Sequence, residues 1–187
     1  EQGVQFERAL APSSHTREAV PSIFTGLPPH EAVDRSFKRA APTLATHLSD
    51  THVSGAFHSN PYVSRAYGFS RDFDHFYDDL RLGQNRVFAL LQRAIDKFVL
   101  NKGEYHARAS EINERSLAWL DSLDGGPFFL WNHYMDVHGP YNPPNTVEGY
   151  TDVSLTNAES QELYTKCVDD PASLTDEEKR LLIDLYD

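Results

Sequence analysis

The fold class is decided by residues 128–141, which read Phe128-Phe129-Leu130-Trp131-Asn132-His133-Tyr134-Met135-Asp136-Val137-His138-Gly139-Pro140-Tyr141. The first four residues are apolar on both faces of an extended chain, which is typical of a central strand in a sheet covered on both sides. Polar residues follow at the carboxyl end of this strand, where α/β sheets place their sites. Two histidines and one aspartate within six residues suit a metal site or an oxyanion contact. In the alternative, His133 is a satisfied sheet residue and Asp136 caps the turn.

Predicted helices and strands alternate around this segment. Apolar residues at helical spacing predict two helices before it, and Gly125-Gly126-Pro127 ends the second. A further helix begins near Pro42, which suits a first helical turn, and another follows a capping box at Thr175. The alternation predicts an α/β fold with a mainly parallel central sheet flanked by helices. The expected elements are strands at 1–6, 53–57 and 128–131, and helices at 84–100, 108–123 and 176–187, with residues 139–170 as an excursion over the surface.

The composition bounds the class of protein. The 187 residues are enough for one domain or part of a larger one, and both ends are abrupt, so we expect a piece of a longer protein. Acids outnumber bases 28 to 17, a formal net charge of −11, which argues against a nucleic-acid partner. No apolar run is long enough to span a membrane. The single Cys167 excludes an internal disulfide and a cysteine-based zinc cage.

The charges also bear on source and compartment. Five of the 17 bases are lysine and 12 are arginine. An acidic, lysine-poor surface stays hydrated in strong salt, which predicts a halophilic, archaeal source. The alternative is an ordinary acidic cytosolic protein. Residues 1–20 lack a basic segment followed by an apolar core, so we expect a cytoplasmic location unless a signal lies upstream of Glu1.

The second informative segment is residues 13–26, a hydroxyl-rich loop that enters an apolar helix. Gly26 is a favoured residue just after a helix. Backbone N–H groups at such a helix start attract anions. Pro21 limits the start to about Arg17 or Glu18, because its ring clashes with the carbonyl four residues back. In the alternative, a hydroxyl side chain simply caps the helix, the candidates being Ser13, Ser14 and Thr16.

Together the two segments resemble the sulfatases of the alkaline-phosphatase-like superfamily, and the resemblance runs nearly end to end. Residues 128–141 are similar to the family pattern FFL..H..D.H.PY, which is the strongest match. The resemblance implies one internal portion of a sulfatase-like N-terminal catalytic domain over residues 1–187, incomplete at both ends. Two further matches lie near the beginning of the chain: a strand and loop at 3–13, and a helix at 21–30 that ends in the family's TG pair followed by P and H. The others are a TLA..L helix with the next strand at 42–57, the GF..FD.F segment at 68–76, and a helix at 176–187.

The same resemblance implies a nucleophile nine residues before the threonine of the TG pair, at Thr16. Sulfatases carry Cys or Ser there, matured to formylglycine within C/S-x-P-x-R, whereas this chain reads Thr16-Arg17-Glu18-Ala19-Val20. A threonine nucleophile resembles the phosphodiesterase and phosphoglycerol-transferase branch of the superfamily. Metal coordination activates such a hydroxyl, and in-line attack gives a covalent ester that water then releases.

Substrate contacts are implied as well. Sulfatases often have a Gly-Lys pair after the strand at 53–57, and its lysine binds sulfate. Here the stretch is His58-Ser59-Asn60, so Asn60 or His58 is expected to donate to the oxyanion instead. His138 is expected to bind the ester or protonate its leaving group, and His133 is the second choice for a substrate contact.

The implied cofactor is one or two divalent cations, with Ca, Mg, Mn and Zn not distinguished. Of the family's metal ligands, only the nucleophile oxygen of Thr16 falls inside this chain, so the isolated chain is expected to bind metal weakly and to be inactive. The implied activity of the parent protein is metal-dependent hydrolysis of a sulfuric ester of a small molecule, glycan or lipid. Two alternatives stay open: a phosphodiesterase or phosphoglycerol transferase of the same superfamily, and a catalytically silent sulfatase-like protein.

Overall fold

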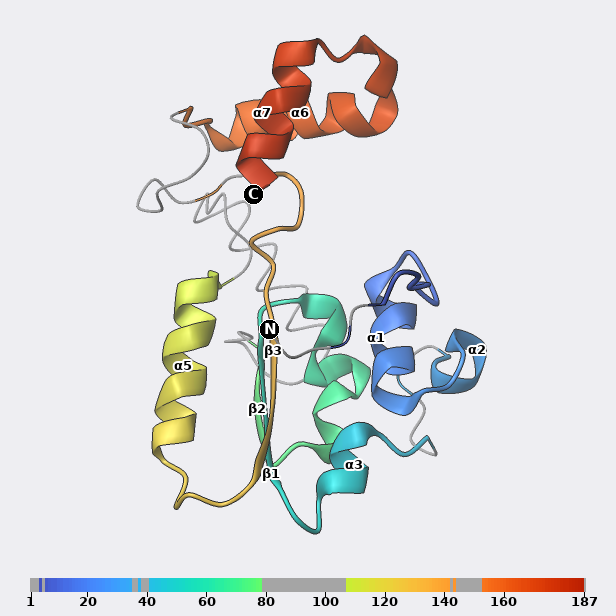
Figure 1. Ribbon diagram of the computed structural model, residues 1–187, viewed down its shortest axis with the longest axis vertical. Coiled ribbons are helices and arrows are strands. Elements are labelled where there is room, and N and C mark those ends of the chain that lie inside the picture. Colours follow the sequence, from blue (N-terminus) through green and yellow to red (C-terminus); the bar gives the residue numbers. More distant parts are fainter. Residues whose placement is uncertain are drawn as a thin grey trace.

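The structure is a computed structural model that describes residues 4, 6–34, 37, 41–78, 107–141, 143 and 153–186. At the centre of this part of the chain lies a three-stranded sheet in the order β2-β1-β3 (Figure 1). Its strands are β1 at Val53–His58, β2 at His75–Tyr77 and β3 at Phe128–His133. β1 pairs in parallel with both neighbours, and helices flank the sheet. The predicted α/β fold with a mainly parallel sheet is therefore confirmed.

The central strand of the described sheet is β1. It is buried from Ser54 to His58, although its sequence contains serine, glycine and histidine. The backbone N–H and the hydroxyl of Ser54 both donate to Asp74 Oδ2, at 2.8 and 2.9 Å. Gly55 is required, because a Cβ there would lie 2.9 Å from ring atoms of Trp119. β3, predicted to be central, is an edge strand within the described residues, and its side chains are exposed or half-buried.

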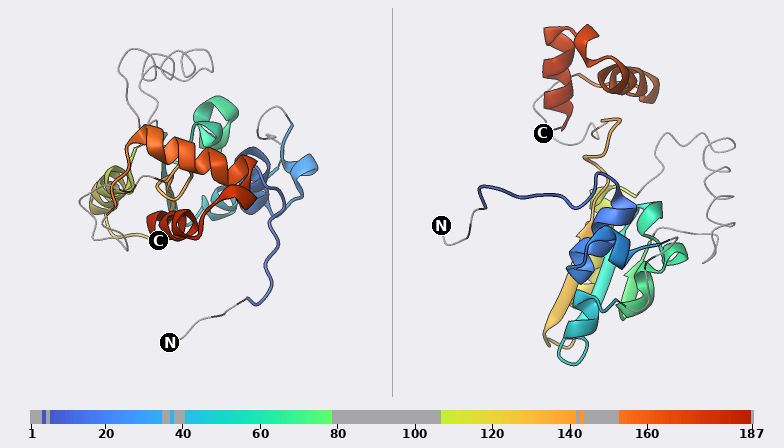
Figure 2. Two further views of the ribbon diagram at one scale, coloured as in Figure 1. Left: turned by 90° about the horizontal axis from the view of Figure 1, so that it is seen from above. Right: turned by 90° about the vertical axis from the view of Figure 1, so that its right-hand side faces the viewer.

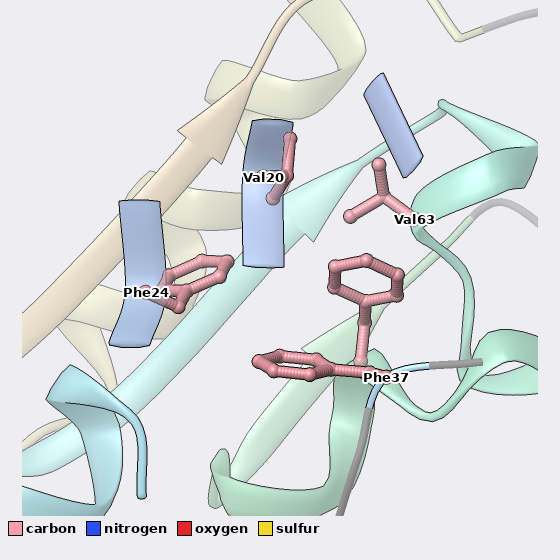
Figure 3. Close-up of a cluster of buried hydrophobic side chains, with 5 residues drawn as sticks. Val20, Phe24, Phe37 and Val63 are labelled. Carbon is pink, nitrogen blue, oxygen red and sulfur yellow. The ribbon is translucent and has the colours of Figure 1, made fainter. Parts of the chain in front are cut away.

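Side chains alternate along the strands and build one hydrophobic cluster on each face of the sheet. On one face, Trp131 packs on Phe24 of α1 (Thr16–Thr25), with ring centroids 4.8 Å apart. On the other face, Leu130 packs against the cluster that contains Ile112 of α5 (Ala109–Asp121). Figure 1 shows α1 and α5 on opposite sides of the sheet. The buried residues of the cluster on the α1 face are Val20, Phe24, Phe37, Val63 and Phe69 (Figure 3).

The beginning of α1 differs from the hydroxyl-capped alternative. The helix starts at Thr16 with His15 as its N-cap residue, and no N-cap side chain bonds to the first turn. Ser13 Oγ accepts a hydrogen bond from the His15 N–H at 3.1 Å instead. Pro21 is the sixth of the ten residues of the helix, which begins one residue before Arg17, and Gly26 ends it in the left-handed conformation with φ of 69°. The predicted end of the helix is therefore confirmed, and the predicted hydroxyl cap is wrong.

Short elements connect the strands. α2 (Pro29–Ala32) and α3 (Leu44–Leu48) precede β1, and Thr43 forms a capping box with Thr46 at the start of α3. Three short 3-10 turns follow β1 and lead to β2. They lie at Pro61–Val63, Arg65–Tyr67 and Phe69–Asp72. The strand and helix predicted around residues 42–57 are confirmed.

A helical hairpin follows β3 (Figure 1). α6 (Asn157–Asp169) and α7 (Asp176–Tyr186) are separated by a 3-10 turn at Pro171–Ser173. Lys166 Nζ lies 2.6 Å from Glu178 Oε1 and ties the two helices together. The predicted helix at 176–187 is confirmed as α7. The segment 139–170, predicted as an excursion over the surface, includes α6, of which only Ser160 is buried. A capping box between Thr156 and Glu159 stabilises the start of α6.

Two further elements were predicted, a strand at 1–6 and a helix at 84–100. The helix predicted at 84–100 lies outside the described residues. The strand predicted at 1–6 is wrong at its two described positions, because Val4 and Phe6 belong to no strand and are 83% and 79% exposed. Figure 2 shows the N-terminal segment leading away from the sheet, so the described part of the chain supplies no partner for a strand there. Among the described helices, none combines the length and the apolar content that crossing a bilayer requires.

Candidate active site

The carboxyl ends of β1 and β3 and the beginning of α1 meet at one pocket. Its volume is about 440 Å³, and its lining includes Thr16, Asn60 and His138. Thr16 is the first residue of α1, Asn60 lies two residues after β1, and His138 lies five residues after β3. Because parallel strands end at the same edge of a sheet, segments far apart in the sequence come together there. The structure thus gathers three of the five predicted site residues in one pocket.

Thr16 is half-buried at the N-terminal end of a ten-residue helix. The aligned peptide dipoles give this end a partial positive charge, and its first N–H groups lack partners within the helix. An anionic group beside Thr16 is therefore stabilised by the helix itself. A hydroxyl in this position is suitably placed to meet a sulfuric or phosphoric ester.

Asn60 is an amide held in a defined orientation. Its side chain is buried, with 2% of the residue exposed, yet it contributes to the pocket lining. Asn60 Oδ1 accepts a hydrogen bond from the backbone N–H of Tyr62 at 3.0 Å, which starts the 3-10 turn after β1. Asn60 Nδ2 lies 3.3 Å from His133 Nε2. The amide can therefore present a donor to an anionic oxygen in the pocket.

His138 has one nitrogen committed to the backbone. Its Nδ1 lies 2.7 Å from the carbonyl oxygen of Gly139, which can only accept, so Nδ1 carries a proton. In the neutral ring, Nε2 is then the basic nitrogen. The backbone N–H of His138 donates to the carbonyl of Met135 at 3.0 Å, which fixes the turn after β3. The exposed imidazole is therefore oriented to exchange a proton through Nε2.

Asp136 has a structural role that differs in detail from the predicted turn cap. Its Oδ2 accepts a hydrogen bond at 2.9 Å from the N–H of Ala109, the first residue of α5. The carboxylate therefore accepts from a backbone N–H at the start of α5, which covers the face of the sheet opposite to α1. This contact accounts for an aspartate at this position without a metal.

His58 is fully buried and is not among the residues that line the pocket. Its ring packs against Phe76 and Trp131, with centroid distances of 5.0 and 5.6 Å. Neither ring nitrogen has a hydrogen-bond partner among the described residues. Burial, and secondly the charge of His133, lower the pKa of His58 to about 3. His58 is therefore neutral near pH 7, and its substrate contact stays a prediction.

His133 lies next to His58 in the sheet. The two histidines are register partners at the ends of β3 and β1. His133 is half-buried, and burial together with the charge of His138 lowers its pKa below the usual range. It reaches the pocket through Asn60 and is not itself part of the lining. Its predicted substrate contact is untested.

Two neighbours of Thr16, to which no chemical role was assigned from the sequence, also line the pocket. Arg17 Cζ lies 5.0 Å above the ring of Tyr67, which holds a positive charge beside Thr16. Glu18 has a buried carboxylate oxygen, Oε2, without a hydrogen-bond partner among the described residues. Both residues could have been found from their place in the first turn of a helix that starts at the predicted nucleophile, Thr16.

The pocket supplies few metal ligands. Thr16 and Glu18 offer oxygen donors of the kind that divalent cations prefer, and the partnerless Glu18 Oε2 suits such a role. The described residues contain no group of three or more His, Cys, Asp or Glu side chains arranged to hold an ion. These residues therefore do not form a complete metal site on their own.

This fold and this site define a class of protein. A parallel sheet flanked by helices carries a hydroxyl at a helix start, an amide and an imidazole at the carboxyl ends of its strands. That arrangement is consistent with the alkaline-phosphatase-like and sulfatase-like α/β fold.

The chain belongs to the sulfatase family, because the family model described as Sulfatase matches residues 1–184. Membership identifies a hydrolase family whose members generally use divalent metal ions. No curated protein and no solved structure matches the chain.

Proposed function

We propose that this chain carries the nucleophile side of the active site of a metal-dependent hydrolase that cleaves sulfuric esters. The observation that carries the proposal is the meeting of Thr16, Asn60 and His138 in one pocket at the start of α1. The family match supports a hydrolase, and the pocket supports attack on an anionic ester. The substrate is the sulfuric ester of a small molecule, a glycan or a lipid.

Each side chain has a distinct task in this mechanism. The Thr16 hydroxyl gives its proton to bulk water as its oxygen attacks sulfur and forms the Oγ1–S bond. The bond from sulfur to the leaving oxygen breaks, and His138 gives the proton on its Nε2 to that oxygen. Asn60 donates to a sulfate oxygen that gains charge, assisted by the positive end of α1. Water then attacks the covalent ester by the reverse proton route and releases sulfate.

The proposed enzyme uses one or two divalent cations, with the Thr16 oxygen as one ligand. A bound cation would supply an acidifying charge at that hydroxyl. The described residues do not complete its site, so the remaining ligands belong to other parts of the protein. Glu18 is the residue of the described chain that best suits an additional ligand.

One observation favours a second candidate function. The nucleophile position holds threonine, where the resembled sulfatases carry Cys or Ser, and the residues after it lack the Pro and Arg of the maturation signature. A phosphodiesterase or phosphoglycerol transferase uses the same pocket chemistry with phosphorus in place of sulfur. The catalytically silent reading predicts no turnover of either ester.

The experiment compares aryl sulfate, phosphate monoester and phosphodiester substrates with the whole protein, in strong salt with added divalent cations. Thr16→Ala is the test variant, and Thr51→Ala, at an exposed turn, is the matched control. Sulfate release that is lost only in Thr16→Ala supports the proposal. Phosphoester turnover with the same loss supports the second candidate. Turnover that survives Thr16→Ala, or no turnover of any ester, overturns the catalytic assignment.

A further inference from the structure

The orientation of the Asn60 amide follows from its neighbours by elimination. The backbone N–H of Tyr62, which can only donate, lies 3.0 Å from one end of the amide, so that end is Oδ1. The other end is therefore the NH2 group, which also only donates. It lies 3.3 Å from His133 Nε2. That nitrogen must accept, and the neutral His133 ring must carry its proton on Nδ1.

We propose that His133 is a positioning residue, whose Nε2 fixes the Asn60 amide so that its second N–H serves an anionic oxygen in the pocket. This inference rests on the proposed function, in which Asn60 contacts the anionic ester group. It adds a residue that acts through Asn60 and does not touch the substrate. The His133 ring is thereby assigned one tautomer.

Burial supports this assignment. Asn60 is 2% exposed, and buried amide protons nearly always have an acceptor. Within the described residues, Asn60 Nδ2 bonds to His133 alone, so one amide proton is left for a pocket ligand. An anionic ester oxygen is the acceptor that the start of α1 favours there.

The surroundings of His133 hold its ring in place. Its backbone pairs with His58 in the parallel ladder, and its ring lies 5.5 Å from that of Trp131. Burial and the charge of His138 lower the pKa of His133, which keeps the ring neutral near pH 7. A neutral ring can accept from the amide, whereas a protonated ring has two donors and cannot.

The first arm of the experiment reads the tautomer directly. Long-range nitrogen–proton spectra of the ¹⁵N-labelled protein distinguish a histidine protonated on Nδ1 from one protonated on Nε2. The expected result near pH 7 is a His133 ring with a bare Nε2. A proton on Nε2 overturns the proposal. This arm needs no variant and no activity, so it gives its answer whether or not the proposed function holds.

The second arm measures binding of inorganic sulfate by His133→Gln, His133→Leu and the exposed control His47→Gln. Gln places an acceptor oxygen near the position of Nε2, and Leu has none. Losing the hydrogen bond that orients Asn60 is expected to weaken sulfate binding about tenfold in His133→Leu. His133→Gln and His47→Gln should retain most of the affinity. Equal binding by all variants overturns the proposal.

The two arms separate failure of this inference from failure of the proposed function. Wild-type protein that binds no sulfate, but has His133 protonated on Nδ1, retains the hydrogen bond and refutes the Asn60 contact with the anion. Sulfate binding with His133 protonated on Nε2 refutes the positioning role and leaves the proposed function intact.

Discussion

His58 and His133 are register partners at the ends of neighbouring parallel strands, and only His133 has a hydrogen-bond partner for its ring among the described residues. The central strand thus ends in a fully buried imidazole, and the edge strand ends in one that meets an amide of the pocket. His58 therefore bears on the stability of the fold, whereas His133 bears on the pocket.

The buried His58 predicts a loss of stability in acid. Its folded-state pKa of about 3 lies below the ordinary value of 6.5, so protons bind the unfolded chain more tightly. Stability is retained above pH 6.5 and falls as the pH drops from there toward 3. Between pH 7 and pH 5 the loss from this residue is about 2 kcal/mol.

The test is urea denaturation of wild type, His58→Phe and His47→Gln at pH 7 and pH 5. Phe matches the aromatic surroundings of His58 and cannot titrate. Between pH 7 and pH 5, the free energy of unfolding of His58→Phe should therefore fall by about 2 kcal/mol less than that of wild type. Part of the loss remains, because His75 and His133 also have lowered pKa values, each chiefly through burial. An unchanged loss in His58→Phe would refute the assignment.

The close approach of β1 and α5 predicts that Gly55→Ala destabilises the fold. The new Cβ would lie 2.9 Å from the ring of Trp119, so the helix or the ring must shift. Overpacking of this kind costs about 1–3 kcal/mol. The matched control is Gly126→Ala, where a Cβ has no heavy atom within 4 Å. Thermal unfolding should show a lower Tm for Gly55→Ala than for Gly126→Ala, and equal values would contradict the close contact.

Asp136 predicts a measurable contribution to the stability of α5. Asp136→Ala removes the acceptor for the Ala109 N–H and should cost about 1 kcal/mol, in the range found for lost helix caps. Asp136→Asn keeps an oxygen acceptor and should lose less. Urea denaturation at pH 7 measures both variants, and an Asn variant as unstable as the Ala variant would rule out the capping contact.

The proton route predicts how His138→Gln responds to the leaving group. Loss of a positioned proton donor lowers turnover by about 10²–10⁴-fold, with the largest effect on esters whose leaving groups hold protons tightly. Activated aryl esters should be much less affected. His30→Gln, a largely exposed histidine, is the control. A uniform loss across all leaving groups would show that His138 binds the ester and does not transfer the proton.

Local sequence signals predicted most elements because their causes are local. The Thr175 capping box precedes α7, and Gly26 ends α1 with a positive φ that glycine adopts without strain. The central position of β1 was not predictable in this way. Its burial depends on partners far along the chain, such as Asp74 for Ser54 and Trp119 for Gly55.

The candidate site was predicted in part for the same reason. Residues after strands meet at one edge of a parallel sheet, so Thr16, Asn60 and His138 could be grouped from sequence and resemblance. The different surroundings of His58 and His133 could not be predicted from the sequence, because burial and hydrogen bonding depend on side-chain packing across the sheet.

The hydrogen bond from Ala109 to Asp136 joins the two layers of the molecule at the site. Asp136 is two residues from His138 in the turn after β3, and it accepts a hydrogen bond from the first backbone N–H of α5. Opening of the turn that carries His138 is therefore expected to release the Ala109 N–H, so the deuterium uptake of this one amide should report whether the pocket is assembled.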